Sequence, residues 1–234
     1  RLTQVAFIIP NVAKSAATLL ALSGNKLYMD ERSDLGPIDP QLLVSQPSGQ
    51  VMSIPAQAIE RGFAQALEAV REDKRALLAY GPLLAKCDVW LLEMCRTATQ
   101  GAKELAEKWL AKYMFGGEPD AAGTAKRIAD RLADSGRYKS HARPIGIVEA
   151  TEMGLLVEDT RRYPDLRDAI WQLYCNVEIH MERSPCAKLF ENAADVAIAR
   201  MVPAQVAVRP AGPPRRREQE PQPGPNRATG RKRE

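Results

Sequence analysis

The chain has 234 residues, of which 45% are hydrophobic and 26% are charged, and its formal net charge is +4 at pH 7. This length and hydrophobic content predict one folded domain with a sizeable core and appendages. No uncharged apolar stretch reaches the roughly 18 residues that a membrane-spanning helix needs, so the sequence predicts no such helix.

The first elements predicted along the chain are a strand and a helix. An apolar run at residues 5–10 predicts a buried strand, and small and apolar residues at 16–22 predict a helix after a tight turn. Ser15 stands where that helix starts, beside backbone N–H groups without partners and at the positive end of the dipole. It could cap the helix, as serine often does, or the same field could stabilise an alkoxide or oxyanion.

Two further sequence segments, at 26–41 and 136–157, form a pattern together with the segment at 13–22. A short strand is predicted at 26–30, followed by a loop at 33–41 with the sequence Ser-Asp-Leu-Gly-Pro-Ile-Asp-Pro-Gln. Residues 136–145 read Gly-Arg-Tyr-Lys-Ser-His-Ala-Arg-Pro-Ile, and Glu-Ala and Met-Gly-Leu-Leu-Val follow before residue 158. With the segment 13–22, these blocks resemble the serine dehydrogenase proteinases, a group of Clp-fold serine peptidases, and more distantly signal peptide peptidase A.

This resemblance extends from about residue 4 to residue 157 and implies a Clp/crotonase-like layered α/β fold. It also implies Ser15 as the nucleophile, a polypeptide substrate, and a homo-oligomer assembled through inserted helices. His141 matches a Ser/Thr-His block of the family, although Ala142 stands where an acid usually follows. The oxyanion donors of the family come from a Gly-Gly turn that would precede Arg1, so we expect the N-terminal strands to be missing here.

The sequence offers two candidates for the general base that would activate Ser15, His141 and a lysine. His141 could equally be a structural residue, hydrogen-bonded within its loop. Lys14 is adjacent to Ser15 and should point elsewhere, which predicts a solvated charge or a substrate contact at the rim of the cleft. Nothing in the sequence aims Lys26 at Ser15. Asp39 could in principle accept a proton, but its Asp-Pro-Gln context favours a turn lock, in which the side chain bonds nearby backbone.

The rest of the body is predicted to be mostly helical. Apolar residues follow helical spacing from residue 53 to a break at Gly81-Pro82, and then again as far as Gly116-Gly117. Shorter helices should end near Gly136 and Gly154, and a strand is predicted at 155–157. A last helix is predicted to begin at Pro164, with His180 on its surface near its C-terminal end. We expect the aromatic and methionine side chains of this helical arm to form core, or alternatively a subunit interface.

The cysteines predict neither a metal site nor a cofactor. They form no Cys-x-x-Cys pair and have no histidines at ligand spacing; they are Cys87, Cys95, Cys175 and Cys186. We expect buried thiols on helices and a reducing, cytoplasmic compartment. Because Arg1 leads directly into a strand, no signal peptide is expected, and membrane association would need a segment not present in this chain.

The basic charge is concentrated at the C-terminal end. Residues 203–234 contain eight basic and three acidic residues and seven prolines, which leaves the body at 1–202 close to neutral. This composition predicts a disordered tail beyond a Clp/crotonase-like peptidase domain at 1–202. The tail could weakly contact nucleic acid or an anionic membrane, or it could be only a solvated appendage.

Three functions follow as hypotheses. The first is a serine endopeptidase that cleaves polypeptides through a Ser15 acyl-enzyme, with His141 or a lysine as the base. The alternative is a non-catalytic relative that serves as an oligomeric assembly or binding module, since the oxyanion glycines and a clear base are not found. A crotonase-type acyl-thioester enzyme gains no support, because it would require a carboxylate near the start of the helix.

Overall fold

The computed structural model describes residues 4–45, 48–85, 88–194 and 196–201, so the predicted tail and Cys87 lie outside the described residues. The chain divides between Val177 and Glu178 into two compact units, each described here by itself. Within the described part, no helix has the length and apolar character needed to cross a membrane. The protein is a mixed α/β structure, as the sequence predicts.

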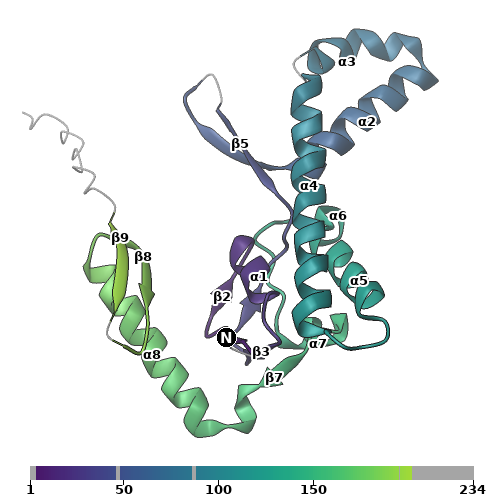
Figure 1. Ribbon diagram of the computed structural model, residues 1–234. Coiled ribbons are helices and arrows are strands. Elements are labelled where there is room, and N and C mark those ends of the chain that lie inside the picture. The colour runs from purple at the N-terminus through teal and green to yellow at the C-terminus, as the bar shows by residue number, and fades with distance from the viewer. Residues whose placement is uncertain (1–3, 46–47, 86–87, 195, 202–234) are drawn as a thin grey trace, which may run out of the picture. The chain divides into compact units, whose positions relative to one another are not determined.

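A small parallel sheet forms the base of the first unit (Figure 1). Its strands are β1 (Ala6–Ile8), β3 (Lys26–Met29) and β7 (Val157–Asp159), in the order β1-β3-β7. A second parallel pair joins β2 (Val12–Ala13) to β4 (Asp34–Leu35). The short helix α1 (Ala16–Ala21) connects β2 to β3 and lies where the apolar pattern predicts a helix, whereas β2 and β4 stand where the sequence predicted a tight turn and a loop.

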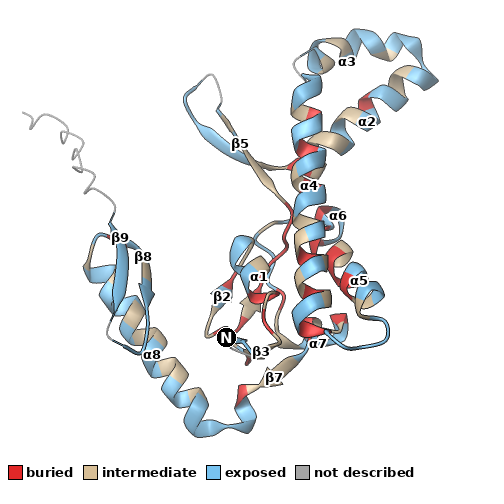
Figure 2. Ribbon diagram, viewed as in Figure 1, coloured by how far each residue is buried: buried red, intermediate tan, exposed pale blue. Residues whose placement is uncertain are grey.

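Helices pack beside these strands and close the hydrophobic core. The long helix α4 (Val89–Trp109), extended by a π-helical turn at Leu110–Met114, packs against α5 (Ala121–Ala133). The short helices α6 (Ser135–Tyr138) and α7 (Ile147–Met153) follow. The buried residues gather on α1, the lower half of α4, α5 and the loops between them (Figure 2).

An arm projects from this core. It consists of the hairpin of β5 (Gln41–Ser45) and β6 (Val51–Pro55), the helices α2 (Ala56–Glu72) and α3 (Leu77–Leu84), and the start of α4. Figure 2 shows the arm to be mostly exposed. Leu78, Val89 and Trp90 are 86%, 80% and 61% exposed, so these arm side chains do not form core within the described chain.

The helix α8 (Pro164–Arg183) begins in the first unit and ends in the second, as predicted from Pro164. In the second unit, an antiparallel hairpin of β8 (Cys186–Glu191) and β9 (Ala197–Met201) follows it, and no pattern in the sequence predicted that hairpin. His180 is exposed in the last turn of α8, as expected.

Several expectations from sequence are wrong in detail. The run at 5–10 is not a buried strand, since β1 pairs only with β3 and leaves Ile8 46% exposed. Gly81-Pro82 does not end a helix, because α3 continues through both residues, and the break falls instead at Asp73, whose side chain caps a 3₁₀ turn. The strand predicted at 155–157 begins at Val157.

The cysteines also differ from expectation. Cys95 is a buried residue on α4, as predicted. Cys175 on α8 is partly exposed, and Cys186 is buried at the start of a strand rather than on a helix. None of these three thiols is in a disulfide.

Candidate functional site

The turn between β2 and α1 places Ser15 in a strained conformation. Its backbone angles are φ 55° and ψ −116°, and Lys139 is the only other non-glycine residue with positive φ among those described. A residue held in so sparsely populated a region costs about 1–3 kcal/mol. Serine nucleophiles commonly occupy such a strand-to-helix turn, because it presents the hydroxyl at the edge of the sheet.

The side chain of Ser15 does not cap its helix. It forms no capping hydrogen bond with the described residues, so the structural role expected from serine's usual preference is absent there. Thr18 holds the turn instead: its hydroxyl lies 2.6 Å from the Ala13 carbonyl oxygen and accepts a 3.0 Å hydrogen bond from the Gly36 N–H. The Ser15 hydroxyl is therefore left available on a half-buried residue.

A histidine–carboxylate pair lies on two loops that contact this turn through Lys14, although no described contact joins His141 to Ser15 itself. His141 Nδ1 is 2.8 Å from Asp39 Oδ1, and the Asp39 side chain is only 1% exposed. Gln41 Nε2 donates to the other carboxylate oxygen at 2.7 Å. In the neutral imidazole, an Nδ1–H that donates to Asp39 leaves the opposite ring nitrogen Nε2 as the atom that accepts a proton.

This pairing corrects the reading of Asp39 as a turn lock alone. Sequence reasoning left the group that orients His141 unassigned, and the structure supplies it from 102 residues away along the chain. No local pattern could have signalled the contact. A buried carboxylate that holds an imidazole tautomer is the arrangement that general-base catalysis requires.

Backbone contacts bring the two loops to the serine turn. Leu35 and Ile145 exchange two backbone hydrogen bonds of 3.0 Å, which fixes the end of β4 against the chain that follows His141. Lys14 Nζ donates to the Ala142 carbonyl oxygen at 2.6 Å. Lys14 therefore makes an exposed hydrogen bond to the loop of His141, a contact that the sequence did not predict.

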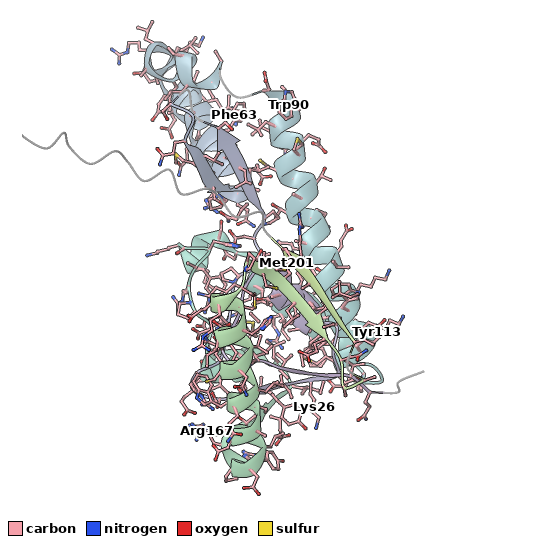
Figure 3. The ribbon with its side chains drawn as sticks, turned by 90° about the vertical axis from the view of Figure 1, so that its left-hand side faces the viewer. Lys26, Phe63, Trp90, Tyr113, Arg167 and Met201 are labelled. Atoms are coloured by element: carbon pink, nitrogen blue, oxygen red, sulfur yellow. The ribbon has the colours of Figure 1, made fainter. Side chains whose placement is uncertain are left out.

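Lys26 lies apart from this arrangement. It opens β3, and its ammonium nitrogen is 5.3 Å from the centre of the Tyr28 ring. Figure 3 labels Lys26 at the lower end of the sheet. No described contact links Lys26 to Ser15, as the sequence suggested.

Charged residues that include Arg143, two residues after His141, line a depression of the surface. This depression of about 590 Å³ is lined by Arg137, Arg143 and Glu149, among others. Glu149 pairs with Arg143 at 3.3 Å and with Arg131 at 3.6 Å. Burial, and secondarily the charge of Glu149, raises the pKa of the neighbouring Tyr138.

An ionic cluster fastens the first turns of α8 to the carboxyl end of β3. Asp30 is buried and pairs with Arg32 and, at 3.2 Å, with Arg167, which Figure 3 labels on α8. Burial alone would raise the pKa of Asp30, but the hydrogen bonds and charge of the two arginines lower it to about 2. Arg32 also stacks on the Trp171 ring at 4.2 Å.

The same stretch of α8 contacts the segment that leads to the serine turn. Asn11 Nδ2 donates to Tyr174 Oη at 2.6 Å. No group of three His, Cys, Asp or Glu residues able to hold a metal ion occurs among the described residues.

Comparison with known proteins gives two distant relatives. The chain is 31% identical over 151 residues to uncharacterized protein MJ0137 of Methanocaldococcus jannaschii, and 27% identical over 150 residues to uncharacterized protein MJ1495 of the same organism. The matches cover 64% of this chain but 42% and 41% of those proteins, so the chain spans about two fifths of the length of the relatives. No model of a known family matches it, and no solved structure does.

Proposed function

We propose that this chain carries the catalytic residues of a serine endopeptidase with a Clp/crotonase-like fold. The observation that carries the proposal is the strained, uncapped Ser15 on a turn tied to the His141–Asp39 pair. The positive φ of Ser15 lowers the stability of the folded protein, and no capping hydrogen bond of its hydroxyl offsets this cost. Backbone strain of this kind is concentrated at functional sites.

The mechanism assigns one role to each group. Ser15 Oγ attacks the scissile carbonyl of the polypeptide, while His141 Nε2 accepts the hydroxyl proton and then gives it to the leaving amine. Asp39 holds the imidazole in the required tautomer and stabilises the imidazolium. Water, deprotonated by the same nitrogen, then hydrolyses the acyl-enzyme and restores Ser15.

One oxyanion donor is available beside the nucleophile. The N–H of Ala16 donates to no acceptor in the described chain, and the amide after a nucleophilic serine commonly serves this purpose. It supplies one donor to the oxyanion that develops on the scissile carbonyl.

A second candidate function is supported by the arm. Its exposed apolar side chains favour a module that assembles with copies of itself, a function that needs no reactive serine. Self-assembly is compatible with peptidase activity, so the two proposals differ only in whether Ser15 reacts. We propose a homo-oligomer in either case.

Cleavage of an unfolded protein such as casein separates the two functions. The endopeptidase proposal predicts peptide release that is lost in Ser15→Ala and retained in Ser23→Ala, which removes a hydroxyl at the other end of α1. Equal release by both variants would trace the activity to a contaminant or another residue. Absence of release from the wild-type chain would favour the assembly module.

A further inference from the structure

Lys14 connects the serine turn to the loop of His141. It stands between β2 and Ser15, and its ammonium group reaches the carbonyl oxygen of Ala142, the residue directly after the histidine. That loop is itself closed locally, because the Arg143 N–H donates to the Ser140 carbonyl oxygen at 3.1 Å. The hydrogen bond from Lys14 to the Ala142 carbonyl oxygen therefore restrains the turn at residues 140–143, which carries the His141 imidazole.

Gly36 provides the space through which Lys14 passes. A Cβ atom added to Gly36 would lie 2.7 Å from Lys14 Cγ and 2.9 Å from Lys14 Cβ, closer than atoms in proteins approach. The glycine is needed here for this close approach. The loop that leads on to Asp39 thus packs directly on the Lys14 stem.

We propose that Lys14 is a positioning residue that holds the His141–Asp39 pair at the Ser15 turn. It touches three segments at once: the turn itself, the loop before Asp39 and the loop of His141. Because Lys14 Nζ is directed at the Ala142 carbonyl oxygen, beside the histidine, we assign Lys14 a role that acts through His141. This inference rests on the proposed function.

The test is the rate at which a fluorophosphonate labels Ser15, measured in the full chain by mass spectrometry of the labelled peptide. Lys14→Met should lower this rate about 10- to 100-fold, because small displacements of a catalytic group carry penalties of that order. Lys14→Arg retains a donor of similar reach and should restore most of the rate. Lys26→Met removes the same charge from a lysine outside the site and should label like the wild type.

Combination with His141→Ala distinguishes positioning from a general effect on stability. If Lys14 acts through His141, the double variant Lys14→Met/His141→Ala should react no more slowly than His141→Ala alone. A normal rate in Lys14→Met, or losses that multiply in the double variant, would overturn the role of Lys14 while leaving Ser15 labelling intact. A wild-type chain that does not label at Ser15 would instead overturn the proposed function. Thermal unfolding is followed in parallel, and Lys14→Gln replaces Lys14→Met if the latter does not fold.

Discussion

At the scale of single residues, Ser15 combines strain with an unused hydroxyl. Its φ of 55° and ψ of −116° form the mirror image of an extended conformation, which glycine adopts readily and serine does not. The hydroxyl forms no cap that would offset the strain, among the contacts the structure describes. The conformation is therefore a cost to stability that a reactive hydroxyl would explain.

This cost predicts that Ser15→Gly stabilises the protein. Relief of the strain should raise the free energy of unfolding by about 1 kcal/mol relative to Ser15→Ala, which keeps a Cβ atom in the strained position. Both variants should lose fluorophosphonate labelling. Urea unfolding of the two variants gives the difference, and a less stable glycine variant would show that the turn is not strained.

Asp39 is predicted to matter for the reaction more than for the fold. Asp39→Asn preserves the shape of the side chain but places an amide against His141, which favours the wrong imidazole tautomer. The labelling rate of Ser15 should fall by about 10²- to 10⁴-fold. Asp34→Asn, a substitution in the neighbouring strand β4, serves as the matched control and should label normally.

A circular dichroism spectrum close to that of the wild type should accompany the loss in Asp39→Asn. An unchanged labelling rate would remove Asp39, and with it the oriented imidazole, from the mechanism.

At the scale of elements, the cluster around Asp30 joins α8 to the sheet. Its contribution depends on pH because the pKa of Asp30 is about 2 in the folded protein, below its ordinary value of 3.8. A lowered folded pKa means that the stabilisation is complete above the unfolded value and is lost as pH falls toward 2. The shift corresponds to about 2 kcal/mol.

Asp30→Asn should therefore be less stable than the wild type at pH 7 and should show a weaker loss of stability between pH 5 and pH 2. Urea unfolding followed by tryptophan fluorescence over this pH range measures both effects. Asp73→Asn removes an exposed carboxylate whose pKa is lowered by Arg75, and it should alter the pH dependence much less because solvent screens that pair. Parallel pH curves for wild type and Asp30→Asn would contradict the assignment.

The helices were predictable from sequence because each signal is local. The signals for α4, α5, α7 and α8 are the apolar spacing inside each helix and a glycine or proline near one of its ends. The arm hairpin β5-β6 was not predicted, and its strands leave large apolar residues such as Leu43 exposed instead of alternating over a core.

The candidate site was predictable only in part. The position of Ser15 at a helix start follows from sequence, but whether its hydroxyl caps the helix depends on Thr18 and Gly36. The pairing of Asp39 with His141 depends on loops brought together by β4 and its bridge to Ile145. Contacts between segments far apart in the chain produce no periodic pattern of residues, so they could not be predicted from the sequence.

At the scale of the whole molecule, the arm is the feature that bears on assembly. Several of its large apolar side chains are at least half exposed; they are Leu43, Val51, Leu77, Leu78, Leu83, Val89 and Trp90. Figure 3 labels Phe63 and Trp90 in this part of the chain. Apolar surface of this kind marks interaction sites, and aromatic residues often dominate their energetics.

The proposed homo-oligomer predicts that Trp90→Glu shifts the protein toward monomer. Sedimentation velocity at matched concentrations measures the change, with Leu173→Glu as the control because Leu173 is 65% exposed on α8 and lies outside the arm. The control should sediment like the wild type. A monomeric wild type, or equal behaviour of the two variants, would contradict assembly through the arm.

Mapping of a covalent adduct tests the central claim most directly. After exposure of the wild-type chain to a fluorophosphonate, peptide mass spectrometry should find the phosphonyl group on Ser15, at a rate that His141→Ala strongly lowers. An adduct spread over several surface serines, or none on Ser15, would contradict the claim that this turn carries an activated nucleophile.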